Sequence, residues 1–125
     1  MANMTRNLVD HLTEVFDGRI DVVRKMPSEV SGLDLSTPLL FVKMVGGDTT
    51  NNRVLLERRT FALNLFAEDY DAADDAYHLM ESTMYGIGGN AKLILGPYEI
   101  AAKGEESDFD DVVRYGSSWT LTDYR

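Results

Sequence analysis

An alternating strand that passes without a breaker into an acid-capped helix, between Arg53 and Tyr85, constrains the fold more than any other segment of this chain. Within Arg59 to Ala67, the side chains of Phe61, Leu63 and Leu65 fall on one face of an extended strand. The opposite face carries Thr60, Asn64 and Glu68. This pattern predicts a strand that is buried on one side only.

A helical period replaces the alternation from Ala73 onward. Apolar side chains then recur at helical spacing, at Ala73, Ala76, Tyr77, Met80 and Met84. The helix dipole favours carboxylates at the start of a helix, and four aspartates crowd this start: Asp69, Asp71, Asp74 and Asp75. Together these features predict a helix that begins near Tyr70 and ends at Gly86.

The chain before Arg53 contains one more helix and two more strands. Leu8 to Phe16 has a single apolar face, with Thr5 or Asn7 as the expected N-cap and Gly18 at the end. Ile20 to Met26 predicts a short strand that Pro27 stops. Leu39 to Val45 predicts an apolar strand, and the polar residues 46–52 predict a flexible hairpin tip.

Two strands follow the central helix. A glycine-rich turn over residues 86–90 leads into a strand at Lys92 to Leu95, which bends at Gly96 and Pro97 and continues from Tyr98 to Ala102. An acidic loop covers residues 105–111. A last strand has Val113, Tyr115, Trp119 and Leu121 on one face.

The predicted order is therefore α-β-β-β-α-β-β in a single domain over residues 1–125. The class is α+β, with a mixed or antiparallel sheet of about five strands and two helices packed on it. Two helices can cover only one face of such a sheet, and its edge strands stay open unless they are blunted or paired. Assembly with further copies of the chain is the expected consequence.

Composition narrows the classes of function. The 125 residues include 12 basic and 21 acidic side chains, so the formal charge is −9. Such a charge disfavours binding to the phosphates of nucleic acid. The chain has no cysteine, so it has no disulfide framework and no thiolate metal site. We expect neither a signal peptide nor a membrane span, because the longest apolar stretch is Leu39 to Val42.

None of the candidate chemical motifs is complete. The glycines near Gly86 follow a helix and precede a strand, the reverse of a dinucleotide-binding turn. His78 and Glu81 lie three residues apart on the central helix, a spacing that suits two metal ligands or an acid–base pair, but a third partner is missing. Ser117 has no strand-to-helix elbow around it. We expect no catalytic residue, no metal and no cofactor.

Four basic residues sit on predicted strands in adjacent pairs: Arg24, Lys25, Arg58 and Arg59. Side chains alternate along a strand, so each pair sends one charge to either face. Two readings stay open, since these charges suit ion pairs between subunits as well as solvated edge charges.

The order of elements and the run from Phe61 to Tyr85 resemble the tail terminator, or tail completion, proteins of long-tailed bacteriophages. The resembling parts are an amino-terminal helix at Leu8 to Phe16, a hairpin with a long apolar strand at Leu39 to Phe66, the acidic helix at Asp69 to Tyr85, and a final strand that carries Arg114 before alternating large residues.

This resemblance implies a virion structural protein, assembled in the host cytoplasm, that caps the tail tube as a hexameric ring. The ring would stop tail polymerisation, dock a head completion or neck protein, and let DNA pass without binding it. The expected interface is Gly46, Gly47, Asp48, Thr49, Thr50, Asn51, Asn52, Arg53, Arg58, Arg59 and Arg114. The alternatives are a monomeric or dimeric module that binds a small ligand or partner, and another neck or minor tail protein.

Overall fold

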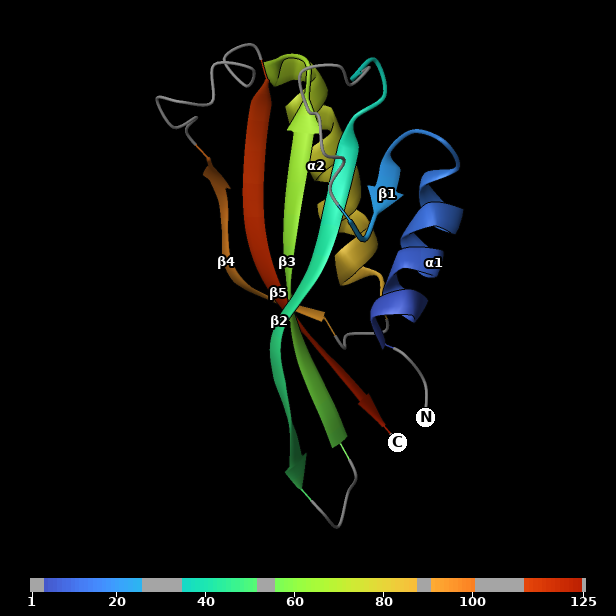
Figure 1. Cartoon of the computed structure of the whole chain (residues 1–125), viewed down its shortest axis with the longest axis vertical. Helices are drawn as coiled ribbons and strands as arrows, with labels where there is room; N and C mark the ends of the chain where they lie inside the picture. The colour runs from blue at the N-terminus through green and yellow to red at the C-terminus, as the bar shows by residue number, and fades with distance from the viewer. Residues whose placement is uncertain (1–3, 26–34, 52–55, 88–90, 101–111, 125) are drawn as a thin grey trace.

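A computed structural model describes residues 4–25, 35–51, 56–87, 91–100 and 112–124 (Figure 1). Its helices are α1 (Met4–Phe16) and α2 (Tyr70–Tyr85), and its strands are β1 (Asp21–Val23), β2 (Leu39–Asn51), β3 (Leu56–Ala67), β4 (Ala91–Glu99) and β5 (Val113–Tyr124). The strands form one sheet in the order β1-β2-β3-β5-β4. The pair β1–β2 is parallel and the other pairs are antiparallel, so the predicted α+β class and element order are confirmed.

Both helices pack on one face of the sheet. In Figure 1, α2 passes behind β3 and β2, while α1 stands beside β1. The core between them joins Leu12 and Phe16 of α1 to Met80 and Met84 of α2 and to the inward side chains of the strands. Burying each large apolar side chain stabilises the fold by roughly 1.5–3 kcal/mol.

Two aromatic residues form the centre of this core. Phe61 of β3 lies opposite Trp119 of β5 in the strand register, and both side chains are fully buried. The ring of Tyr85, at the end of α2, meets Trp119 edge to face with 5.1 Å between centroids. The predicted alternation of β3 and β5 therefore places its large residues where α2 covers them.

The predicted bounds of α2 are confirmed. The Asp69 carboxylate accepts a 2.7 Å hydrogen bond from the backbone N–H of Ala72, and Gly86 is the C-cap. The predicted caps of α1 are wrong, because α1 begins at Met4 and both Thr5 and Asn7 lie inside it. The buried face of this helix begins only at Leu8, so the helix starts one turn before its first core residue.

The polar segment expected as a hairpin tip is strand for most of its length. Residues 46–51 continue β2 because the first half of β3 supplies a partner for all of them except Thr50, down to the pair Asn51 and Leu56. Register shifts after Met44 and after Thr49 absorb the extra residues as bulges. Asn52 and Arg53 lie outside the described residues, and the described part of β3 begins at Leu56 rather than at Arg53.

Strand β1 is shorter than the predicted Ile20 to Met26. Ile20 is buried in the main core, and only Asp21 to Val23 pair with β2. The chain bends at Arg24 and Lys25, whose charged side chains are exposed, and Met26 lies outside the described residues. Beyond Phe41, no described strand pairs with the outer edge of β2.

The face of the sheet opposite the helices is covered at one end. There Phe66 and Leu39 pack with Leu35 in a small second cluster, and the neighbouring Arg114 is only 9% exposed. The prediction of a strand buried on one side thus holds for the middle of β3 but not for its carboxyl-terminal end. Toward the hairpin, this face lacks such a cluster among the described side chains.

Strand β4 is one bent strand, as predicted, with register shifts on both sides of Leu95. It ends at Glu99, and Ala102 and the acidic residues 105–111 lie outside the described residues. At the bend, Gly96 has φ +115, and a Cβ built there would lie 2.8 Å from the carbonyl oxygen of Gly116. Glycine is therefore required for β4 to stay close to β5. Of the helices described, neither is long and apolar enough to cross a membrane.

Candidate functional site

The two ends of the sheet are the open parts of the described fold. Strand β4 pairs only with β5, and β2 pairs only with β3 once β1 has ended. Unpaired strand edges present a row of backbone N–H and C=O groups that another chain can pair with. These two edges therefore lie at opposite ends of one sheet, and no further described strand pairs with either of them.

The β4 edge is unusually apolar for a solvent-facing strand. Ile94 is 56% exposed, Leu95 is 59% exposed and Tyr98 is 40% exposed. Monomeric proteins seldom keep several large apolar side chains exposed on one short segment without a binding role. The Tyr98 ring lies over Gly116, where a Cβ would approach it to 2.7 Å, so a glycine in β5 makes room for this ring.

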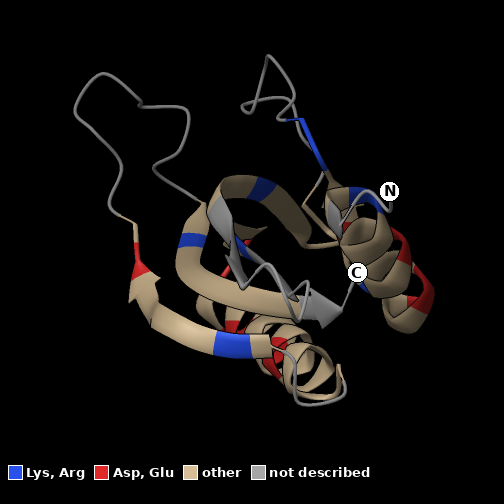
Figure 2. Ribbon diagram, turned by 90° about the horizontal axis from the view of Figure 1, so that it is seen from below, with Lys and Arg blue, Asp and Glu red and all other residues tan. Residues whose placement is uncertain are grey.

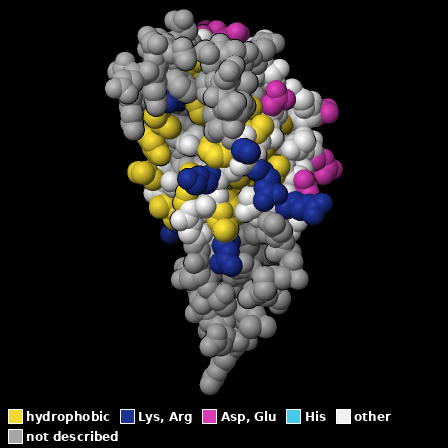
Figure 3. Space-filling view, in the orientation of Figure 1, with side chains coloured by type: hydrophobic (Ala, Val, Ile, Leu, Met, Phe, Trp, Pro, Cys, Tyr) yellow, Lys and Arg dark blue, Asp and Glu magenta, His cyan; other side chains and the backbone are white. Residues whose placement is uncertain are grey.

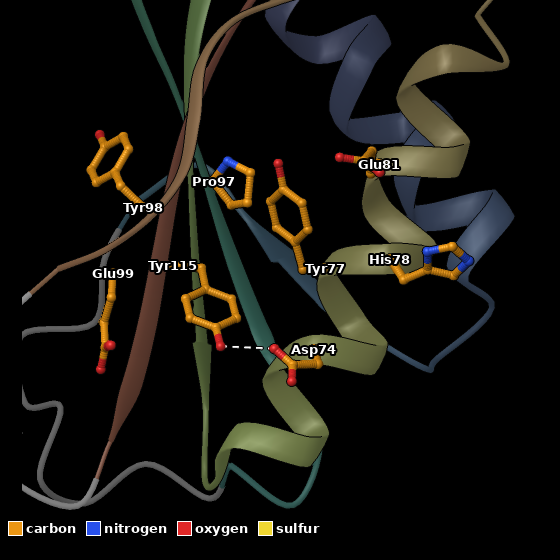
Figure 4. A pocket seen from close by; sticks show the side chains of 8 residues that line it. All are labelled: Asp74, Tyr77, His78, Glu81, Pro97, Tyr98, Glu99 and Tyr115. Carbon is orange, nitrogen blue, oxygen red and sulfur yellow. Dashed lines mark hydrogen bonds between the residues drawn. The ribbon is translucent and has the colours of Figure 1, made fainter.

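A pocket of about 410 Å³ opens between α2 and the β4 edge (Figure 4). Its lining comes from α2, β4 and β5: Asp74, Tyr77, His78, Glu81, Pro97, Tyr98, Glu99 and Tyr115. Three of these residues are carboxylates, three are tyrosines, and none is a lysine or arginine. The pocket is therefore acidic and aromatic.

Two tyrosine–carboxylate hydrogen bonds hold the wall of the pocket. The Tyr115 hydroxyl donates to Asp74 Oδ1 at 2.7 Å, and the Tyr70 hydroxyl donates to Glu99 Oε1 at 2.6 Å. Both bonds stabilise the protonated tyrosine: the bond to Asp74 raises the pKa of Tyr115 to about 12, and the bond to Glu99 raises the pKa of Tyr70. They order the carboxylates but leave their negative charge in place.

Tyr77 closes the inner side of the pocket. Its ring meets Tyr115 edge to face with 6.2 Å between centroids, and its buried hydroxyl has no hydrogen-bond partner in the described chain. Burial raises the pKa of Tyr77 to about 12, with a further contribution from the charge of Glu81. The nearby Ser117 hydroxyl opposes this rise in the pKa; it accepts a 2.9 Å bond from Trp119 Nε1 and donates to the Leu63 carbonyl oxygen at 3.5 Å.

The opposite edge of the sheet has the opposite charge. Exposed Arg24 and Lys25 directly follow β1, and exposed Lys43 lies on β2 beside Met44 and Val45, which are 49% and 54% exposed. Figure 3 shows the helix-free face of the sheet, where Lys, Arg and hydrophobic side chains gather in the middle and Asp and Glu lie at the margins.

Charge is separated between the layers of the molecule. In Figure 2, Asp and Glu (red) lie on both helices, whereas most of the charged residues marked on the strands are Lys and Arg (blue). From Glu68 to Tyr85 the chain has six carboxylates and no lysine or arginine: Glu68, Asp69, Asp71, Asp74, Asp75 and Glu81. The net charge of −9 is therefore distributed unevenly: the helix layer is acidic, and the helix-free face of the sheet carries most of the basic side chains shown.

The residues expected at an interface are only partly brought together. Gly46, Gly47, Asp48, Thr49, Thr50 and Asn51 lie on the open half of β2, and Arg58 and Arg59 face them from β3. Gly46 is exposed and Arg59 is half-buried, while Arg114 is buried at the other end of the sheet. Arg114 thus lies apart from the rest of the expected set.

His78 and Glu81 both line the pocket, but they do not form a pair. Figure 4 shows the His78 ring pointing away from the other labelled side chains, and no hydrogen bond joins it to Glu81 in the described chain. Within the described residues, no group of three His, Asp or Glu side chains is placed to hold a metal ion.

Sequence reasoning missed the pocket and the apolar β4 edge. The pocket combines residues 74–81 with residues 97–99 and 115, so only the fold brings them together. A signal was present at the edge, where Leu93, Ile94 and Leu95 follow one another without the polar alternation of a half-buried strand.

No family model matches this sequence, and no curated protein matches it. Among solved structures, the chain is similar to one chain of a structure titled "Virion of native gene transfer agent (GTA) particle". That alignment covers 91% of this chain and 84% of the other, with 13% sequence identity and a TM-score of 0.46. A likeness of this degree establishes neither a family nor a function.

Proposed function

We propose that this protein is a virion structural protein of a long-tailed bacteriophage, and that it caps the end of the tail tube as a ring. One observation supports this proposal most: two open sheet edges, at opposite ends of one sheet, that both carry exposed apolar side chains. A subunit of this kind satisfies each edge by joining a neighbour.

Joining different edges gives a ring rather than a dimer. The β4 edge and the β2 edge are different surfaces, so their contact is heterologous and leaves one free edge at each end of a growing chain. If each subunit is rotated from its neighbour by the same angle, and that angle is a whole fraction of a full turn, the last subunit joins the first. The ring is then closed and has no free edge. A hexamer is the number that the resemblance to tail terminators implies.

The capping role follows from the same resemblance. A closed ring seated on the last ring of tail tube protein presents a different surface at its far side, so further tube protein finds no matching site. That far side would dock the head completion or neck protein. Exposed carboxylates on the helices would let DNA pass through the ring without binding, because like charges repel the phosphate backbone.

Tube assembly in the presence of this protein tests the proposal. The tail tube protein from the genome that encodes this chain would be polymerised with and without added ring, and tube lengths would be measured by electron microscopy. We expect shorter tubes that carry one ring at a single end. Unchanged tube lengths with no ring at either end would contradict the capping role.

A second candidate function has one observation in its favour, the pocket between α2 and β4. Its volume of about 410 Å³ falls within the range of small-molecule sites, and its lining would suit a cationic amine. A monomeric or dimeric binding module would then be expected. Sedimentation velocity separates the two, since this second function predicts a monomer or dimer and the first predicts a ring.

A further inference from the structure

We propose that the acidic pocket between α2 and β4 receives a lysine or arginine side chain from the β1–β2 edge of a second copy of this chain. The inference rests on the proposed ring and names the contact that would close it. The occupant is another copy because both halves of the contact are present on one chain, at opposite ends of its sheet.

The pocket needs a positive charge from outside. Its lining includes Asp74, Glu81 and Glu99 but no lysine or arginine. Asp74 and Glu99 each accept one hydrogen bond from a tyrosine, which fixes their direction and leaves further lone pairs free for a charged donor. The tyrosine rings add faces over which a cation is attracted.

The opposite edge supplies that charge next to apolar surface. Arg24, Lys25 and Lys43 are exposed there, and Met44 and Val45 lie beside Lys43. On the pocket side, exposed Ile94 and Leu95 lie on β4, five and four positions before Glu99. Exposed Lys92 also lies on β4, but it is seven positions before Glu99 and does not line the pocket. Around the pocket, each edge therefore offers one charged patch and one apolar patch, with opposite signs of charge.

Two carboxylate residues of the described chain lie along the basic edge, Asp21 and Asp48, and neither adjoins Lys43; Asp48 comes five positions after it on β2. Asp21 is exposed, but it pairs with Leu39 in the parallel register, four positions before Lys43 along β2. The alternative contact, between two identical edges, would bring three carboxylates against three carboxylates. Like charges in an interface suppress such pairings, so the contact between unlike edges is favoured.

Two charge reversals and their mixture test the contact. Glu99→Arg replaces one of the three pocket carboxylates by a cation, and Lys43→Glu replaces one of the three exposed cations of the other edge by a carboxylate; both residues are exposed, so both variants should fold. Each variant alone should raise the apparent dissociation constant of self-association by about tenfold or more. An equal mixture should recover assembly, because the two reversed side chains attract each other and the unchanged edges still match.

Glu68→Arg is the control, since Glu68 is exposed and does not line the pocket, and it should assemble as the wild type does. Glu81→Arg, at a second carboxylate of the pocket, should behave as Glu99→Arg does. Sedimentation velocity at low salt gives the readout, and urea unfolding confirms that each variant is folded.

The outcomes separate this contact from the proposed function. Wild-type assembly by both single variants, or a mixture that fails to recover, would overturn the contact while the ring itself stands. A wild-type protein that stays monomeric would overturn the contact and the proposed function together.

Discussion

The Tyr115 hydroxyl donates a 2.7 Å hydrogen bond to the Asp74 carboxylate and so joins β5 to α2 across the mouth of the pocket. The bond from Tyr70 to Glu99 joins the start of α2 to the end of β4 in the same way. Because tyrosines from the body of the fold hold both carboxylates, the acidic wall is ordered before any partner arrives. Such preorganisation lowers the entropy cost of binding.

Removing the Tyr115 hydroxyl should weaken the fold slightly. Tyr115→Phe deletes the bond to Asp74 and leaves the ring, so we expect a loss of about 0.5–1 kcal/mol in the free energy of unfolding. Urea unfolding at neutral pH measures it. Tyr98→Phe is the matched control, because the Tyr98 hydroxyl enters no hydrogen bond within the described chain. Equal stability of Tyr115→Phe and the wild type would contradict the role of this bond.

The Tyr77 hydroxyl should contribute nothing to stability. It is buried without a hydrogen-bond partner among the described residues, so Tyr77→Phe removes a desolvated polar group and keeps the packing. We expect the free energy of unfolding to stay unchanged or to rise by up to about 1 kcal/mol. A loss larger than that of Tyr115→Phe, measured by the same urea titration, would mean that this hydroxyl has a partner.

Stability should fall in strong alkali through these two tyrosines. The pKa values of Tyr77 and Tyr115 are raised from 10.0 to about 12, the first mainly by burial and the second mainly by its bond to Asp74. A raised pKa means that the folded state holds the proton more tightly, so this stability is complete below pH 10 and is lost as pH rises toward 12.

Urea unfolding as a function of pH measures this loss, with the double variant Tyr77→Phe and Tyr115→Phe as the comparison. Lysines titrate in the same range, so only the difference between wild type and double variant reports on the tyrosines. A wild type and a double variant with the same slope between pH 10 and pH 12 would contradict the assignment.

The bend of β4 should depend on Gly96. Gly96→Ala puts a Cβ at φ +115 and 2.8 Å from the Gly116 carbonyl oxygen, and we expect a loss of about 1–3 kcal/mol. Gly46→Ala is the matched control, since a Cβ at Gly46 meets nothing within 4 Å. Thermal unfolding compares the two variants. If both substitutions lower the stability by the same amount, the close approach of β4 to β5 is not the reason that glycine is needed at position 96.

The parts of the fold that could be predicted are those that local periodicity specifies. The alternation around Phe61 identified the central strand, and the aspartates before α2 identified the helix with correct bounds, because packing of one face and a cap are local properties. The extent of β2 could not be predicted, since residues 46–51 have turn-forming side chains and become strand only through pairing with β3. Pairing over distance overrides such local preference.

The candidate site was harder to predict than the fold. Arg114 was grouped with the hairpin residues, yet the register places it opposite Phe66 at the covered end of the sheet. The acidic pocket depends on Tyr115 and Asp74, which are 41 residues apart in sequence, and no spacing rule brings them together. The net charge of −9 likewise carries no information on position, so it could not predict that Lys43 and Glu99 lie on opposite edges of the sheet.

Sedimentation velocity of the wild-type protein, followed by electron microscopy of the assembled fraction, tests the central claim most directly. We expect one closed ring of a fixed number of copies, with a central opening, in exchange with monomer. A protein that stays monomeric at every concentration, or that grows into open filaments without closing, would contradict it.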